Sequence, residues 1–124
     1  MSASLSFIAP PPGFEPSIDF VLAEIADSVG LYSLSATDES ARRVFVLDAA
    51  VYLPDYTPSL SSEQSEALAL TSGEQARVYV VANPAESGTT VNLLAPIVVN
   101  SLNNAAAQFI LDDRDWPVQA PLGA

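Results

Sequence analysis

The chain has 124 residues, enough for one folded domain, and its fifteen Asp and Glu residues face only four Arg, which gives a formal net charge of −11. This acidity excludes direct binding to nucleic acid and to an acidic membrane surface, because both need clustered Lys and Arg to neutralise phosphates. His, Cys and Lys are absent, which removes His-activated nucleophiles, disulfides, Schiff bases and the usual ligands of transition metals, so we expect neither an enzyme nor a bound metal or cofactor.

The first third of the chain predicts a loop followed by a β-hairpin. Residues 1–11 are expected to be loose, and Pro10–Gly13 favour a stiff extended segment that ends in a turn, because proline fixes φ and lacks a backbone donor. The segment Asp19–Ala26 contains the apolar residues Phe20, Val21, Leu22 and Ile25, and Gly30 separates it from the run Leu31–Leu34. Two such runs joined by a glycine turn predict two paired strands.

The middle of the chain predicts a strand, a surface loop and one short helix. Arg43–Leu47 carries three consecutive residues that favour strands. Two prolines restrict Val51–Ser59 to an edge strand or a loop, because proline cannot donate to a central ladder. Ser61 followed by Gln64 fits a capping box, which predicts a helix that starts at this point and stops before Gly73.

The second half predicts further strands and a loose tail. Ala76–Val81 is predicted to be a strand, and Val91–Val99 is predicted to form two strand segments that Pro96 interrupts. Gln108–Leu111 is predicted to be the last clear strand, and residues 113–124 are expected to be loose. About seven short strands with one short helix predict a mainly β fold, an antiparallel sheet curled into a small barrel. We expect residues 1–124 to form a single domain.

The N-terminal segment and the apolar runs indicate where the protein acts. Residues 1–10 lack the basic start and long apolar run of a signal peptide. No apolar run approaches the roughly 20 residues that span a bilayer. We therefore expect a protein of the cytoplasm that does not associate with membranes. The sequence leaves the oligomeric state open, with a monomer as the preferred interpretation.

Six residues are candidates for contact with a partner protein, because aromatic side chains and their polar neighbours are typical of interface hot spots. For the aromatic residues, packing over or within the core is the alternative, and for the two asparagines it is hydrogen bonding to backbone groups at a bulge and a turn. The candidates are Tyr52, Asp55, Tyr56, Asn92, Asn100 and Trp116.

The densest group of carboxylates is Asp112, Asp113 and Asp115. Such a group suggests a divalent cation site or an acid–base pair for glycoside hydrolysis. It lacks the glycine turn and the longer series of oxygen ligands of a calcium loop, and Arg114 lies within it. A solvated acidic end, or a patch facing a partner, is therefore the preferred interpretation.

Several segments together resemble the flagellar assembly factor FliW family. The most specific stretch is Thr90–Asn100, with its Asn-Leu-Leu-Ala-Pro-Ile core. Other segments agree with the family in the same order: Pro12–Glu15, Val44–Leu47, Leu53–Tyr56 and Gln108–Leu111. The resemblance covers residues 12–111.

The resemblance implies a cytoplasmic regulator of flagellum construction without enzymatic activity. Members bind flagellin and, after flagellin has been exported, bind the translational repressor CsrA instead. The resemblance implies that this antagonism is allosteric, so the factor need not cover the RNA-binding face of CsrA. An acidic chain suits a partner that binds RNA.

The chain departs from the family pattern at its N-terminus. The family carries an additional strand pair before the Pro-Gly-Phe turn, whereas eleven residues precede Pro12 in this sequence. This difference predicts a barrel that is shortened or open on one side. It also leaves an alternative function, a flagellin chaperone that does not bind CsrA, because a missing edge would remove one binding surface.

Overall fold

The computed structural model describes residues 2–11, 14–37, 43–54, 56, 58, 60–71, 75–84, 88–111 and 116–121. Most of the regular structure is β, as the sequence predicted. In chain order the elements are β1 (Ser2–Phe7), β2 (Asp19–Glu24), β3 (Leu31–Ala36), β4 (Arg43–Asp48), α1 (Ala49–Tyr52), α2 (Ser62–Ala67), β5 (Ala76–Asn83), β6 (Thr90–Val91), β7 (Ile97–Asn100), β8 (Ala105–Gln108) and β9 (Ala120–Pro121).

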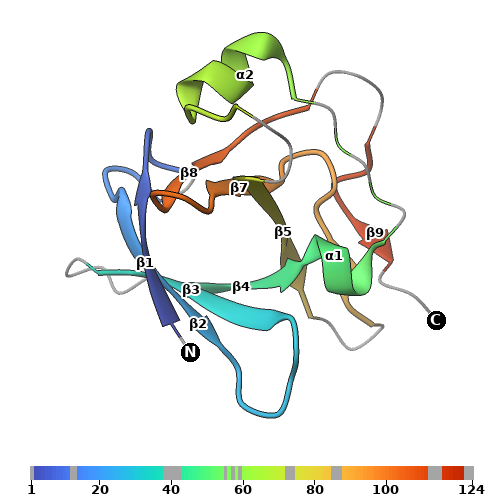
Figure 1. The fold of residues 1–124 in the computed structure, drawn as a ribbon. Coiled ribbons are helices and arrows are strands. Elements are labelled where there is room, and N and C mark those ends of the chain that lie inside the picture. Colours follow the sequence, from blue (N-terminus) through green and yellow to red (C-terminus); the bar gives the residue numbers. More distant parts are fainter. Residues whose placement is uncertain are drawn as a thin grey trace.

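Seven strands close into a barrel, which Figure 1 shows from one end. The order around the ring is β1, β2, β3, β4, β5, β7 and β8, and β8 returns to β1. The pairing of β4 with β5, with Phe45 opposite Ala82, closes the ring. The pairs are antiparallel except for β8 with β1, which is parallel. Closure pairs the strands on both sides and so reduces the free edges that promote aggregation.

The N-terminal segment corrects two expectations from the sequence, because residues 1–11 are not loose and the barrel is not open beside them. β1 pairs with β2 along Ser2–Ser6 and with β8 at Ser6 and Phe7. Leu5 and Phe7 are buried, whereas Ser4 and Ser6 are exposed. This alternation has the period of two that is typical of a strand with one buried face. The proline-rich loop that follows it makes this strand pattern hard to recognise in the sequence.

The C-terminal tail is also partly ordered within the sheet. Thr90 and Val91 of β6 pair with Pro121 and Ala120 of β9, so these two tail residues are not loose. A proline is tolerated in β9 because an edge strand can leave one side of its backbone unpaired. The rest of the expected loose tail that lies at 113–115 and 122–124 falls outside the described residues.

The described residues form two helices, where the sequence predicted one. The additional helix is α1, which takes in Val51 and Tyr52 of the segment that was expected to be a loop or an edge strand. It starts because the Asp48 carboxylate accepts a hydrogen bond of 3.0 Å from the Ala50 N–H. It ends after one turn because Leu53 precedes a proline, which disfavours helical backbone.

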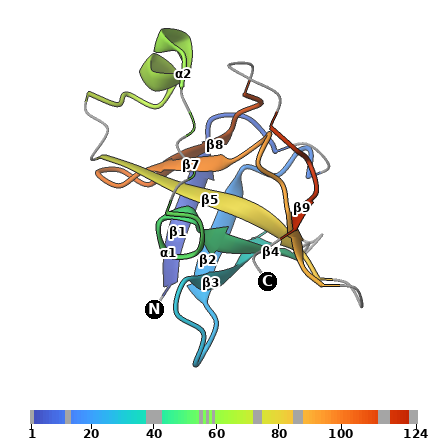
Figure 2. The same ribbon diagram turned by 90° about the vertical axis from the view of Figure 1, so that its right-hand side faces the viewer.

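The predicted capping box of α2 is confirmed. The Gln64 N–H donates to the Ser61 hydroxyl at 3.1 Å, and the Ser61 N–H donates to the Gln64 side-chain oxygen at 2.9 Å. Figures 1 and 2 show α2 outside the barrel, above β7 and β8. The helix itself has no buried residue, and Leu68, directly after it, packs against Val98 and Ala107.

The last strand of the barrel lies three residues before the predicted one. The sequence predicted Gln108–Leu111, but β8 spans Ala105–Gln108, because pairing with β7 and β1 places three alanines in the sheet. Tertiary pairing overrides their weak strand propensity. Phe109 and Leu111 still donate backbone hydrogen bonds to Pro96 and Leu94, at 3.1 and 2.8 Å, so the predicted residues continue along the neighbouring segment.

The apolar residues form clusters on both sides of the barrel wall. The interior contains Phe7 and Phe20, whose rings lie 5.0 Å apart and edge to face. A second cluster lies on the outer face of β4 and β5 and centres on Leu47 and Val80, which point away from the interior. The segments that follow β4 and β6 therefore need to cover this outer face.

Candidate functional site

Tyr56 packs against the outer apolar cluster, and Trp116 contacts Tyr56. The Tyr56 hydroxyl donates a hydrogen bond of 2.5 Å to the Leu93 carbonyl. Its ring lies 4.8 Å from the Trp116 ring at 86°, an edge-to-face contact. Both side chains are half-buried. The structure thus brings together two candidates that are far apart in the sequence, and their rings pack against each other.

The two candidate asparagines satisfy backbone groups. The Asn92 side-chain oxygen accepts from the N–H groups of Leu94 and Ala95 at 3.0 and 3.1 Å. The Asn100 side chain is 1% exposed; it donates to the Leu68 carbonyl at 2.7 Å and accepts from the Leu102 N–H at 2.9 Å. These bonds are the backbone-satisfying alternative that the sequence left open. Asn100 therefore links the turn after β7 to the end of α2.

Tyr52 lies on the surface of α1 and contacts the loop between β2 and β3. Its hydroxyl donates a hydrogen bond of 3.0 Å to the Val29 carbonyl. Gly30 has a φ of +84°, and a Cβ there would lie 2.9 Å from the Tyr52 ring and 3.0 Å from Val51. Only glycine permits both this backbone and this close approach. The loop and α1 are therefore held together, and their exposed apolar residues Val29, Val51 and Tyr52 form what we call the α1 patch.

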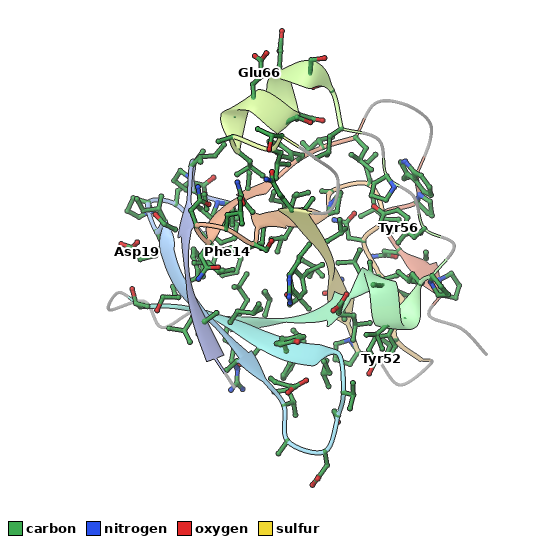
Figure 3. The ribbon with its side chains drawn as sticks, in the orientation of Figure 1. Phe14, Asp19, Tyr52, Tyr56 and Glu66 are labelled. Atoms are coloured by element: carbon green, nitrogen blue, oxygen red, sulfur yellow. The ribbon has the colours of Figure 1, made fainter. Side chains whose placement is uncertain are left out.

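A recess adjoins the α1 patch on the outer face of the barrel. It has a volume of about 310 Å³, at the small end of the range for ligand pockets, roughly 300–1,000 Å³. Tyr52 belongs to both the patch and the recess wall. Figure 3 shows Tyr52 at the lower end of α1. What we call the outer recess is lined by Leu31, Phe45, Leu47, Tyr52, Ala82, Pro84 and Thr89.

Sequence reasoning identified Tyr52 but missed its neighbours in this surface. Val29 is 74% exposed and Val51 is 50% exposed, values that are high for valine. The available signal was a valine beside a glycine in a predicted hairpin turn, a position that usually carries polar residues. The joining of this turn to α1 depends on the fold and is not visible in the sequence.

Four candidate acidic residues lie outside the part of the chain that the structure describes. They are Asp55 and the carboxylates Asp112, Asp113 and Asp115. The described ranges themselves contain no group of three or more Asp or Glu residues arranged to hold a metal ion.

Two tyrosines at one end of the barrel have perturbed acidity. Burial raises the pKa of Tyr79 above its usual 10.0, and a hydrogen bond with Arg77 opposes this rise in part. Burial, together with the negative charges of Glu24 and Asp48, raises the pKa of Tyr32. The two rings lie 5.5 Å apart, edge to face. A raised pKa keeps both phenols protonated near neutral pH, so this pair supports packing and hydrogen bonding and does not act as a base.

Neither described helix has the length and apolar character of a membrane span.

Comparison with known proteins gives the family. The family described as FliW protein matches residues 2–122, which is nearly the whole chain. The chain belongs to the FliW family. The flagellar assembly factor FliW of Exiguobacterium sp. is 32% identical over 123 residues, covering 97% of this chain and 83% of the relative. Those of Thermoanaerobacter pseudethanolicus and Bacillus subtilis are 32% and 26% identical over 114 residues, covering 90% of this chain and 76% and 80% of the relatives.

A solved FliW structure has the same fold. The crystal structure of the flagellar assembly factor FliW matches with a TM-score of 0.87 and 26% identity, covering 96% of this chain and 84% of that chain. The resemblance seen in the sequence motifs is therefore confirmed, and so is the barrel. This chain is a member of a family of flagellar assembly factors.

Proposed function

We propose that this FliW-family protein regulates flagellum construction by switching between two protein partners. It binds flagellin and, once flagellin has been exported, binds CsrA and relieves translational repression. It acts in the cytoplasm as a monomer, without chemistry of its own and without touching RNA. The observation that carries this proposal is the family match across residues 2–122.

Charge and surface character support a role in protein binding. The net charge of −11 favours encounter with a basic partner such as an RNA-binding protein. The α1 patch exposes large apolar side chains beside a recess, an arrangement that is typical of contact surfaces.

The proposal is tested with purified protein, flagellin and CsrA. Size-exclusion chromatography should give a complex with each partner separately. Adding flagellin to the preformed complex with CsrA should release CsrA, because the two complexes are proposed to exclude each other. Failure to bind either partner, or a stable complex of all three proteins, would contradict partner switching.

The alternative is a chaperone that binds flagellin only. The sequence suggested it because only eleven residues precede Pro12; β1 lies within these residues and pairs with β2 and β8. The same experiment separates the two functions, since a chaperone of this kind would form a complex with flagellin and none with CsrA.

A further inference from the structure

The segment that carries α2 is capped by its own residues. We call residues 60–71 the α2 strap, and Figure 2 shows α2 standing away from the strands of the barrel. At the C-terminal end of the helix, the Ala69 N–H donates to the Glu66 carbonyl at 3.0 Å, and the Leu70 N–H donates to the Ser65 carbonyl at 2.9 Å. This pair of bonds is a Schellman turn, and the capping box serves the other end. The hydrogen bonds that cap the helix are therefore made within the strap itself.

Few buried contacts hold the α2 strap on the barrel. α2 has no buried residue. Leu68 is 1% exposed and packs against Val98 on the outer face of β7, and its carbonyl accepts the hydrogen bond from the Asn100 side chain at 2.7 Å. Leu60 and Leu70 are half-buried at the margin of the same cluster. Within the described residues, the main anchors of the strap are thus one buried side chain and one buried amide.

The packing between the α2 strap and β5 is incomplete. A recess of about 430 Å³ lies between them, with Leu70 on the side of the strap and Val78 on the side of β5. Side chains that do not interlock across such a gap lose the dispersion contacts of a packed interior. The end of the strap is joined to the residue before β5 by an exposed hydrogen bond of 2.7 Å, from the Thr71 N–H to the Gln75 side chain. Water can replace this bond, so it adds little to the attachment.

The turn at the end of α2 stores backbone strain. Ala69 has a φ of 56°, in the left-handed region where glycine is favoured and a Cβ is disfavoured. A helix of six residues is not stable by itself in water, so we expect the helix and its turn to melt together once the strap leaves the barrel. Melting releases the strain at Ala69, which therefore favours the detached strap.

We propose that the α2 strap detaches from the barrel and docks again as one unit, while the barrel stays folded. In the closed form Leu68 covers Val98 and Ala107, and in the open form this apolar outer face of β7 and β8 is exposed to water. Segments with few buried contacts are those that open below global unfolding. A protein that recognises only one of the two forms would bind according to the population of that form. This inference does not rest on the proposed function.

Native-state hydrogen exchange of the full chain, followed by NMR, tests whether the strap opens separately. The Leu70 amide reports on the strap, and the amide of Val46, which is 0% exposed on a strand paired on both sides, reports on the barrel. The protection factor of Leu70 should be at least about tenfold below that of Val46. It should also depend little on urea, because opening the strap exposes little surface. Equal protection and equal urea dependence at the two amides would overturn the proposal.

The variant Phe7→Leu tests whether the barrel stays folded when the strap opens. It creates a cavity in the interior, which destabilises the closed and open forms alike relative to the unfolded chain. The protection of Val46 should therefore fall about fivefold or more, whereas the protection of Leu70 should not change. A fall by the same factor at both amides would mean that the strap opens only when the barrel unfolds, and the proposal would fail.

Two variants within the strap should shift its opening in opposite directions. Leu68→Ala removes the buried anchor, so exchange of the Leu70 amide should become at least about tenfold faster. The matched control is Leu102→Ala, which is 73% exposed in the turn between β7 and β8 and should leave this exchange unchanged. Ala69→Gly relieves the strained turn of the closed form, so exchange should become about threefold slower. Unchanged exchange in Leu68→Ala, or faster exchange in Ala69→Gly, would contradict detachment of the strap as a unit.

Discussion

Asn100 illustrates how one buried polar side chain connects separate parts of this protein. Its amide donates to the Leu68 carbonyl, at the end of the α2 segment, and accepts from the Leu102 N–H in the turn after β7. α2 has no buried residue of its own, so this bond and the packing of Leu68 hold the segment on the barrel. A buried polar group of this kind stabilises only while all its partners remain.

We predict that Asn100→Ala lowers the free energy of unfolding by about 1–3 kcal/mol, because it leaves a buried carbonyl without its donor. Urea unfolding measures the change. Asn103→Ala is the control, because its side chain is exposed and accepts one bond from the Ala105 N–H at 2.9 Å, which water can replace. Equal losses in the two variants would mean that the Asn100 bonds do not hold α2.

The raised pKa of Tyr79 predicts how the free energy of unfolding changes at alkaline pH. Its pKa is raised by burial above 10.0, so the folded state holds the phenol proton more tightly than the unfolded chain does. The stability from this difference is fully present below the unfolded pKa of 10.0 and is lost as pH rises through the folded value. Unfolding free energy should therefore stay level up to about pH 10 and fall as pH rises further.

The variant Tyr79→Phe tests this assignment. It removes the titrating group while keeping the ring against Tyr32, so the fall in unfolding free energy across this pH range should become smaller. Urea unfolding at each pH measures it, and tyrosinate absorbance follows the ionisation. A fall of the same size in wild type and variant would place the alkaline sensitivity on other groups.

At the scale of elements, β1 is the strand that completes the ring. It pairs with β2 on one side and with β8 on the other, and its Phe7 ring packs on Phe20 in the interior. Without β1, the neighbouring edges of β2 and β8 would be unpaired, which favours association between chains. The segment that local reasoning assigned to a loose end thus becomes part of the wall.

Adjacent residues at the end of β1 give a direct test. We predict that Phe7→Ala costs about 3–5 kcal/mol of unfolding free energy, because Phe7 fills the interior and a cavity replaces it. Ile8→Ala should cost less than about 1 kcal/mol, because Ile8 is 47% exposed. Where Phe7→Ala does not fold, Phe7→Leu provides a milder change for urea unfolding. Similar losses at Phe7 and Ile8 would contradict the inward orientation of Phe7.

At the scale of the whole molecule, the charge balance is the dominant property. A net charge of −11 on a chain of 124 residues means that carboxylates repel one another across the folded surface. The same field attracts basic partners and keeps the protein apart from other acidic molecules. Binding and stability therefore respond to salt in opposite directions.

We predict that raising NaCl from about 20 to 300 mM increases the melting temperature, because salt screens repulsion between carboxylates. Circular dichroism measures it. The double variant Asp19→Asn, Glu66→Gln removes two exposed charges, one beside the barrel and one on the outside of α2 in Figure 3, and should show a smaller increase. A melting temperature that falls with salt would show that attractive ion pairs outweigh the repulsion.

The sequence predicted most of the elements whose signals are local. The strands built around Val44–Val46 and Val78–Val81 carry β-branched and aromatic residues in succession, and the capping box of α2 is encoded within four residues. The strand change at Pro96 was also predictable, since β6 and β7 lie on either side of it and both pair with β5. The short motifs and their order along the chain were sufficient to identify the family.

The candidate site was less predictable, because its residues come together only in the fold. Tyr52 was identified from its type, but Val29 joins it from a different hairpin through Gly30. Tyr56 and Trp116 were proposed separately, and their rings meet in the fold. The alanines of β8 have no strand signal of their own, and pairing with β7 and β1 places them in the sheet.

Composition and short-range pattern alone determined that this is an acidic, mainly β protein of the FliW family without His, Cys or Lys chemistry, because those properties are local or additive. The tertiary structure decided that the barrel closes, that β1 belongs to its wall, and that Val29, Val51 and Tyr52 form one surface beside a recess. These features depend on contacts between residues distant in the chain, and such contacts form only when long loops are closed by pairing and burial elsewhere.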